Sequence, residues 1–116
     1  MSLANLNLEQ HPREDGLLIA ARGEIDRSTA PRLSDALRRA TFKAAGQITL
    51  DLCGVTFMDS SGISVLLNAV RRLTRRGRTL SLVCPRGELL RVFQLAGLDG
   101  TLDIRTPREN LSGARF

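Results

Sequence analysis

The sequence has 116 residues, of which 42% are apolar, with one histidine, two cysteines and neither tryptophan nor tyrosine. This length and composition fit one globular domain and leave no room for a second core. No apolar run approaches the roughly 18 residues that a membrane-spanning helix needs. The N-terminal stretch MSLANLNLEQ lacks the basic and apolar parts of a secretion signal. We therefore expect residues 1–116 to form a single cytoplasmic domain that makes no contact with a membrane.

The formal net charge of +5 comes from 17 basic and 12 acidic residues. Five of the basic residues lie close together in the chain: Arg71, Arg72, Arg75, Arg76 and Arg78. This Arg71–Arg78 stretch has two interpretations, either the solvated end of a helix, where cations complement the dipole, or a contact with an anionic partner. A direct role in nucleic-acid binding is not expected, because no tyrosine or tryptophan accompanies these arginines to stack on bases.

The side chains that enzymes and metal sites require are scarce in this chain. The single histidine, His11, stands beside Pro12 in an expected turn, which is a poor place for a catalytic base. Cys53 and Cys84 are too far apart in sequence for a zinc-binding pair, and neither glycine-rich phosphate-binding pattern occurs. We expect no catalytic site, no metal and no cofactor. The two cysteines are expected to be buried free thiols, with a redox-sensing disulfide as the alternative.

The spacing of the apolar residues predicts strands that alternate with helices. Strands are expected at residues 3–9, 17–22, 47–52, 79–84 and 101–105. Helices are expected at residues 30–40, 60–76 and 87–96, and a short one after the capping-box sequence Thr106-Pro107-Arg108-Glu109. A short turn makes the first two strands antiparallel, whereas helical crossovers make the later pairs parallel. The prediction is an α/β fold, with a mixed, mostly parallel sheet of about five strands and about four helices in the order β-β-α-β-α-β-α-β-α.

The segment VTFMDSSGI, residues 55–63, joins the third predicted strand to the longest predicted helix. Asp59 suits the N-cap position, where its carboxylate would accept a hydrogen bond from the amide of Ser61 or Gly62. Capping accounts for the aspartate and serines, but a glycine in the first turn weakens a helix. Small side chains would leave this turn open to another protein. A phosphate on Ser60 would lie where the free amides of the helix favour an anion.

Two stretches of the sequence resemble a known family. Residues 57–63, FMDSSGI, are similar to the phosphorylation-site motif of STAS domains, and most closely to that of bacterial anti-sigma factor antagonists. Residues 23–26, GEID, followed by Ser28-Thr29-Ala30, resemble the family's segment between its second strand and first helix. A weaker match lies at residues 90–98, and the resemblance covers roughly residues 6–106. The resemblance implies that the chain forms a single STAS-like domain and that it is not an enzyme.

The resemblance implies transcription regulation through a phosphorylation switch. The unphosphorylated protein would bind an anti-sigma factor that is also a serine kinase, and this binding would release a sigma factor. The kinase would phosphorylate Ser60, and a metal-dependent serine phosphatase would restore the active form. The implied partner-binding residues are Asp26, Ser28, Thr29, Asp59, Ser61 and Gly62. The alternative is a STAS scaffold or accessory subunit of a signalling or transport complex, which would use the same turn without phosphorylation.

Overall fold

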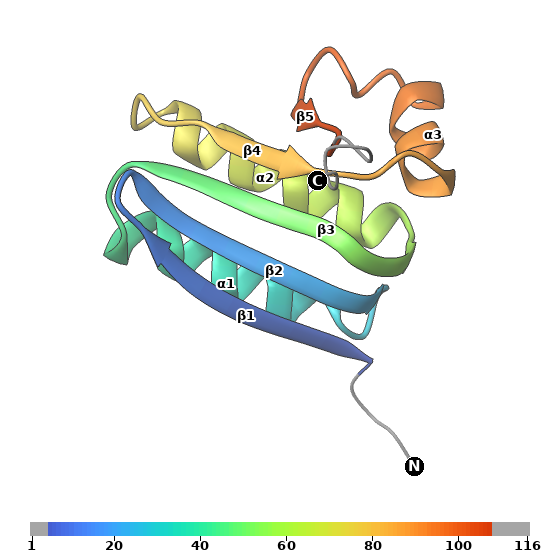
Figure 1. The fold of residues 1–116 in the computed structure, drawn as a ribbon, viewed down its shortest axis with the longest axis horizontal. Coiled ribbons are helices and arrows are strands. Elements are labelled where there is room, and N and C mark those ends of the chain that lie inside the picture. The colour runs from blue at the N-terminus through green and yellow to red at the C-terminus, as the bar shows by residue number, and fades with distance from the viewer. Residues whose placement is uncertain (1–4, 108–116) are drawn as a thin grey trace, which may run out of the picture.

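A five-stranded sheet forms the centre of the computed structural model, which describes residues 5–107 (Figure 1). Its strands follow the chain order across the sheet: β1 (Leu6–Arg13), β2 (Gly16–Ile25), β3 (Gln47–Met58), β4 (Leu80–Val83) and β5 (Asp103–Arg105). Only the β1–β2 pair is antiparallel among these neighbours. The helices within the described residues are α1 (Ala30–Lys43), α2 (Ser60–Thr74) and α3 (Glu88–Leu95). The mixed sheet and the element order through β5 are confirmed, while the fourth helix expected after Thr106 lies outside the described residues.

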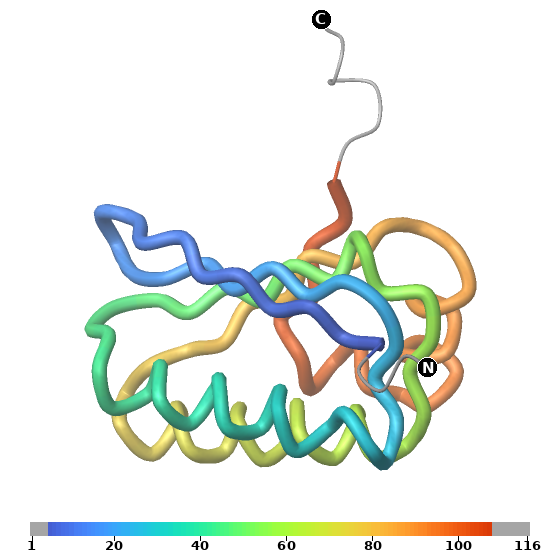
Figure 2. The backbone as a smooth tube through the Cα atoms, turned by 90° about the horizontal axis from the view of Figure 1, so that it is seen from below, coloured from blue at the N-terminus to red at the C-terminus, as the bar shows by residue number. Residues whose placement is uncertain are grey.

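Helices α1 and α2 lie side by side on one face of the sheet (Figure 2). Each helix turns an apolar stripe inward, as the 3.6-residue period predicts. The most deeply buried members of these stripes are Leu33 and Leu37 in α1 and Leu66 and Leu73 in α2. They meet alternate residues of the central strands, namely Ile48, Leu50, Leu52, Leu80 and Leu82. The core therefore lies between the sheet and these two helices.

Strand β2 runs past Gly23, where the sequence analysis expected it to stop. The pairing of β2 with β3 shifts register on both sides of this glycine, as a β-bulge does. Gly23 has φ +112°, and an added Cβ would overlap the carbonyl oxygen of Asn5. The extra residues at both shifts lie in β3, so the glycine is required by its own positive φ and by its close approach to Asn5. The strand then continues to Ile25.

Strand β3 is also longer than predicted. The sequence placed its end at residue 52, and in the structure it continues to Met58. Its second half has no clean alternation of buried and exposed residues, so the period that marks a strand in sequence is missing. Pairing with β2 holds it extended, with Glu24 opposite Phe57 and Ile25 opposite Met58. The end of β3 therefore lies immediately before Asp59.

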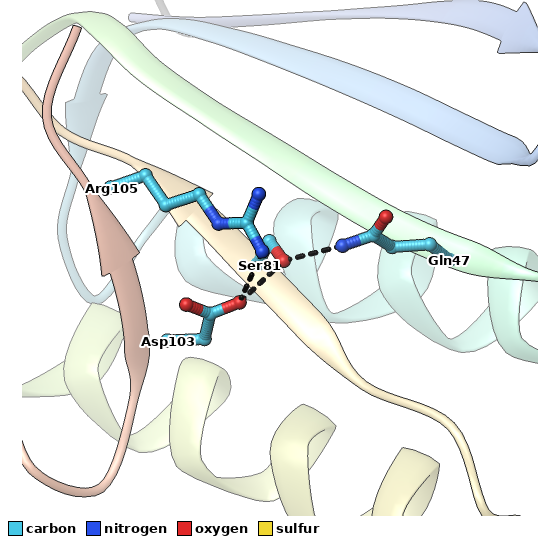
Figure 3. A network of polar contacts seen from close by, with 4 residues as sticks. All are labelled: Gln47, Ser81, Asp103 and Arg105. Carbon is cyan, nitrogen blue, oxygen red and sulfur yellow. Dashed lines mark hydrogen bonds and ion pairs between the residues drawn. The ribbon is translucent and has the colours of Figure 1, made fainter.

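A polar network ties together the three strands at one side of the sheet (Figure 3). The hydroxyl of Ser81 in β4 accepts a hydrogen bond from Gln47 Nε2 at 2.7 Å and donates one to Asp103 Oδ2 at 2.7 Å. Arg105 lies 3.3 Å from the same carboxylate oxygen. The Ser81 hydroxyl lowers the pKa of Asp103, and Arg105 adds to this effect. The network anchors the short strand β5, which is otherwise held by β4 alone.

Candidate functional site

The loops that follow β2 and β3 begin next to each other at one edge of the sheet. The Asp59 amide donates a hydrogen bond to the Ile25 carbonyl oxygen at 3.2 Å. This bond continues the pairing of Ile25 with Met58 at the ends of the two parallel strands. Residues 26–29 and residues 59–62 therefore start side by side. The resemblance implied that Asp26 and Asp59 bind the same partner, and the backbone brings their two loops to the same edge.

Asp59 is the N-cap of α2, as predicted. Its carboxylate accepts a hydrogen bond from the Ser61 amide at 2.8 Å. The amides of Gly62 and Ile63 donate to the Asp59 carbonyl oxygen at 3.1 and 3.3 Å. Three amides of the first turn are thus satisfied by this one residue, which fixes where the helix begins.

Ser60 occupies the first position of α2 and is exposed. Its hydroxyl makes no hydrogen bond to any residue in the described part of the chain. Ser61 is only partly exposed, and its amide is held by Asp59. Of the two adjacent serines, Ser60 is therefore the more exposed.

Gly62 is buried, which differs from the open turn that the sequence analysis expected at this position. A Cβ at residue 62 would lie 2.6 Å from Met58 Cγ and 2.8 Å from Ile25 Cγ2. The absence of a side chain lets the first turn of α2 pack directly against the ends of β2 and β3. This packing is the physical reason for a glycine in the helix, and contact of Gly62 with a partner stays a prediction.

Asp26 organises the loop between β2 and α1. One of its carboxylate oxygens accepts hydrogen bonds from the Ser28 amide and hydroxyl, at 2.9 and 2.8 Å, and from the Thr29 amide at 3.1 Å. These donors lower the pKa of Asp26, with the Ser28 hydroxyl as the largest cause. Asp26 and the exposed Ser28 thus form a prearranged polar surface beside Ser60.

Thr29 lies beneath this surface and not on it, because it is only 3% exposed. Its hydroxyl donates to the Glu24 carbonyl oxygen at 2.8 Å and accepts from the Asp26 amide at 2.9 Å. Thr29 occupies the N-cap position of α1, but its side chain makes no capping hydrogen bond. Its position is that of a support for the Asp26 loop.

A groove lies beside this edge of the sheet, between the end of β3 and the start of α3. Its volume is about 310 Å³, and its apolar lining includes Phe57, Met58, Leu89 and Val92. The Phe57 side chain is 50% exposed and Val92 is 40% exposed. Phe57 belongs to the FMDSSGI motif, but no pattern in the sequence predicted an apolar groove beside it.

The Arg71–Arg78 stretch does not behave as one solvated cluster. Helix α2 ends at Thr74, before residue 76 where the sequence placed its end. Arg71 donates to Asn68 Oδ1 at 3.1 Å. The Arg78 guanidinium donates to three backbone carbonyl oxygens near the end of α1: Thr41 at 2.7 Å, Ala44 at 2.8 Å and Gly46 at 3.0 Å. Arg78 is therefore a structural link between the two helical segments, and the expectation of a solvated side chain is wrong for it.

Both cysteines are free, but only Cys84 is buried, so the expectation of two buried thiols is wrong for Cys53. Partial burial of the sulfur and the neighbouring Asp51 carboxylate raise the pKa of Cys53 to about 12. Burial raises the pKa of Cys84 to about 11. The thiolate is the reactive form of cysteine, so both residues are poor nucleophiles at neutral pH.

Residues 5–107 contain neither a membrane-spanning helix nor a metal-binding group of side chains. No helix in that range is long and apolar enough to cross a membrane. No group of three or more His, Cys, Asp and Glu side chains in that range is arranged to hold a metal ion.

The order of strands and helices, with a capped serine pair at the start of α2, defines the class of domain. The family model described as "Mlab, STAS domain" matches residues 9–106. The chain belongs to the STAS domain family, as the motif at residues 57–63 implied. Among curated relatives, the anti-sigma-B factor antagonist of Listeria monocytogenes is 32% identical over 94% of this chain and 96% of its own length. The protein of the same description from Bacillus subtilis is 29% identical, over 90% of this chain and 95% of its own.

Solved structures agree on the fold. An anti-sigma factor antagonist from Mycobacterium paratuberculosis superposes with a TM-score of 0.81 at 24% identity, covering all of both chains. The unphosphorylated form of the anti-sigma factor antagonist SpoIIAA superposes with a TM-score of 0.73 at 24% identity, covering 90% of each chain. The phosphorylated form of the Bacillus SpoIIAA superposes with a TM-score of 0.67 at 26% identity, covering 90% of this chain and 93% of the other.

Proposed function

We propose that this protein is a cytoplasmic anti-sigma factor antagonist switched off by phosphorylation of Ser60. The unphosphorylated form binds an anti-sigma factor that is also a serine kinase, and this binding releases a sigma factor. Relatives matched over nearly their whole length are described as anti-sigma-B factor antagonists, which supports the regulatory role. Such antagonists are regulators and not enzymes. A metal-dependent serine phosphatase completes the cycle by restoring the free hydroxyl.

The Ser60 hydroxyl, which is exposed and makes no hydrogen bond within residues 5–107, is the observation that carries this proposal. A kinase needs access to the hydroxyl without unfolding the helix, and the first position of α2 provides that access. The cap of α2 depends on Asp59 and not on Ser60, so modification of Ser60 leaves the cap in place. Phosphorylation adds a charge of about −1.5 to −2 at neutral pH, at a helix end whose dipole favours anions. The fold tolerates this charge, whereas a partner packed against the turn does not.

The docking surface in this proposal combines the two adjacent loops with the neighbouring groove. Asp26 and Ser28 supply polar contacts on one side of Ser60, with Asp59 and Ser61 beside it. Phe57 and Val92 supply exposed apolar area on the other side. Apolar area surrounded by polar groups is the usual composition of a specific protein interface. In this proposal the anti-sigma factor covers both parts together.

Phosphorylation in vitro tests the assignment. The protein is incubated with ATP and a purified anti-sigma factor kinase from the source bacterium, and peptides that span Phe57 to Ile63 are mapped by mass spectrometry. We expect phosphate on Ser60 in the parent protein and in Ser61→Ala, and none in Ser60→Ala. Ser60→Asp is expected to fold but to bind the kinase weakly, because a charge in a closely packed interface is costly to desolvate.

Two results would contradict this proposal in different ways. Phosphate on Ser61 would move the switch to the neighbouring residue. No phosphate on either serine, together with unchanged binding of Ser60→Asp, would remove the switch. That second result would favour the alternative of a STAS scaffold or accessory subunit that uses the same surface constitutively.

A further inference from the structure

Four arginines gather near the ends of α1 and α2, away from Ser60. We call Arg38, Arg72, Arg75 and Arg76 the two-helix arginine cluster. Arg38, Arg75 and Arg76 are exposed, and Arg72 is half-buried between them and the core. Ser60 begins α2 and Arg75 follows its last residue, so about 22 Å of helix separates the two sites. The two sites therefore lie at opposite ends of α2.

The cluster is electrostatically unsatisfied. The pKa of Arg72 is lowered, first by burial and then by the positive charges of Arg38, Arg75 and Arg76. The ion pairs of the described residues lie elsewhere, and none includes a member of the cluster. The Nη1 atom of Arg72 is buried and has no hydrogen-bond partner within residues 5–107. A buried donor without an acceptor destabilises the folded state, and it adds to the repulsion among these four charges.

Phe42 positions one side of the cluster. The guanidinium carbon of Arg76 lies 4.5 Å from the centre of the Phe42 ring, which is a cation–π arrangement. The Phe42 side chain is nevertheless 61% exposed. The ring thus restricts the Arg76 side chain while its outer surface remains available for contact.

We propose that the two-helix arginine cluster is a second docking surface, which binds an acidic segment of a partner protein. Guanidinium groups pair with carboxylates through two parallel hydrogen bonds, and several arginines within a small area match a run of Asp and Glu side chains. The exposed guanidinium groups of Arg38, Arg75 and Arg76 supply the donors for these carboxylates.

Two other classes of anionic partner fit the cluster less well. Proteins that bind duplex DNA through its backbone commonly contact about six to ten phosphates, and this cluster offers four charges. Helices that bind a membrane surface bury a broad apolar face. The large apolar side chain exposed beside the cluster is Phe42 alone among the described residues. These observations favour a protein segment.

Fluorescence anisotropy with a labelled short poly-glutamate peptide tests the proposal on the full chain. We expect the double variant Arg75→Gln/Arg76→Gln to bind the peptide about tenfold more weakly, because two exposed ion pairs are lost. The matched control Arg27→Gln/Arg91→Gln removes the same charge from exposed arginines outside the cluster and should stay within about twofold of the parent. Equal losses in the two double variants would show a response to net charge alone and would overturn the proposal.

Further measurements separate the other partners and the proposed switch. A duplex oligonucleotide and vesicles of phosphatidylserine with phosphatidylcholine are titrated at the same salt concentration. Tighter binding of either probe than of the peptide would overturn the assignment to an acidic protein segment. Ser60→Asp should bind the peptide as the parent does, and Arg75→Gln/Arg76→Gln should still be phosphorylated. Loss of peptide binding in Ser60→Asp would contradict a separate surface, whatever the outcome for the switch.

Discussion

The Asp59 amide and the Ile25 carbonyl oxygen are joined by a hydrogen bond of 3.2 Å, and this bond places the two loops of the candidate site next to each other. The bond can form only because β2 continues past Gly23 to Ile25 and β3 continues through its bulges to Met58. Asp26 directly follows Ile25, and Ser60 directly follows Asp59. The spatial relation between the two loops is therefore set by sheet pairing and not by either loop sequence alone.

Replacement of Gly62 by alanine tests the packing at the start of α2. The added methyl group would overlap Met58 and Ile25, so we expect the free energy of unfolding to fall by about 1–3 kcal/mol. In a helix interior with free space, replacing glycine by alanine usually increases stability, so a decrease in the unfolding free energy would point to the overlap. Urea denaturation measures the effect, with Gly100→Ala as a control because an added Cβ there meets nothing within 4 Å. Greater stability of Gly62→Ala would show that the overlap is relieved.

The Asp26 loop predicts a pH dependence of stability. Hydrogen bonds from Ser28 and Thr29 lower the pKa of Asp26 below its ordinary value of 3.8. A carboxyl group whose pKa is lower in the folded state stabilises the fold above its unfolded pKa, and this contribution disappears as the pH falls through the folded pKa. Asp26→Ala should therefore melt at a lower temperature than the parent at neutral pH, and the difference should vanish in acid below pH 3.8. A difference that persists unchanged in acid would exclude ionisation as its cause.

Arg78 and Arg75 are expected to differ sharply although both belong to the basic stretch. Arg78→Gln removes charge-assisted hydrogen bonds to three carbonyl oxygens and should cost about 1–3 kcal/mol of unfolding free energy. Arg75→Gln changes an exposed side chain and should stay within about 0.5 kcal/mol. Chemical denaturation of both variants provides the comparison. Equal effects would contradict a structural role for Arg78.

Arg72→Met should stabilise the fold. The change removes a half-buried charge that three neighbouring arginines repel, together with an unpaired buried donor. Methionine keeps the apolar stem of the side chain, so we expect a gain of about 0.5–1 kcal/mol in unfolding free energy. The same variant should bind the acidic peptide more weakly than the parent. A more stable variant with reduced peptide binding is the pattern expected where a charge is retained for function.

Ser81→Ala tests the network between β3, β4 and β5. The hydroxyl is 1% exposed and serves both Gln47 and Asp103, so its loss should cost about 1–2 kcal/mol. The pKa of Asp103 should rise toward its ordinary value, because the Ser81 hydroxyl is the main cause of its lowering. Thermal unfolding measures the first effect and NMR titration of the Asp103 carboxyl carbon measures the second. Unchanged values of both would show that the network contributes nothing in solution.

The sequence alone predicted the class of fold, the order of elements through β5 and the helix start at Asp59. Those features are local, because amphipathic periods and capping residues act within one or two turns of a helix or along a single strand. The capping role of the Asp59 carboxylate was identified correctly for this reason. The motif around Ser60 is also local, because it consists of seven consecutive residues, and it pointed to the family.

Only the tertiary structure decided how far β2 and β3 extend, why residue 62 is glycine and which arginines are free. Pairing between strands distant in sequence holds residues 53–58 extended although their pattern lacks a period of two. The requirement for Gly62 comes from Met58 and from Ile25, and Ile25 lies far from Gly62 in the chain. Arg78 and Arg72 look alike in sequence, yet one satisfies three carbonyl oxygens and the other has an unpaired donor among the described residues. Contacts of this kind depend on how separate elements pack, and no local pattern in the sequence encodes them.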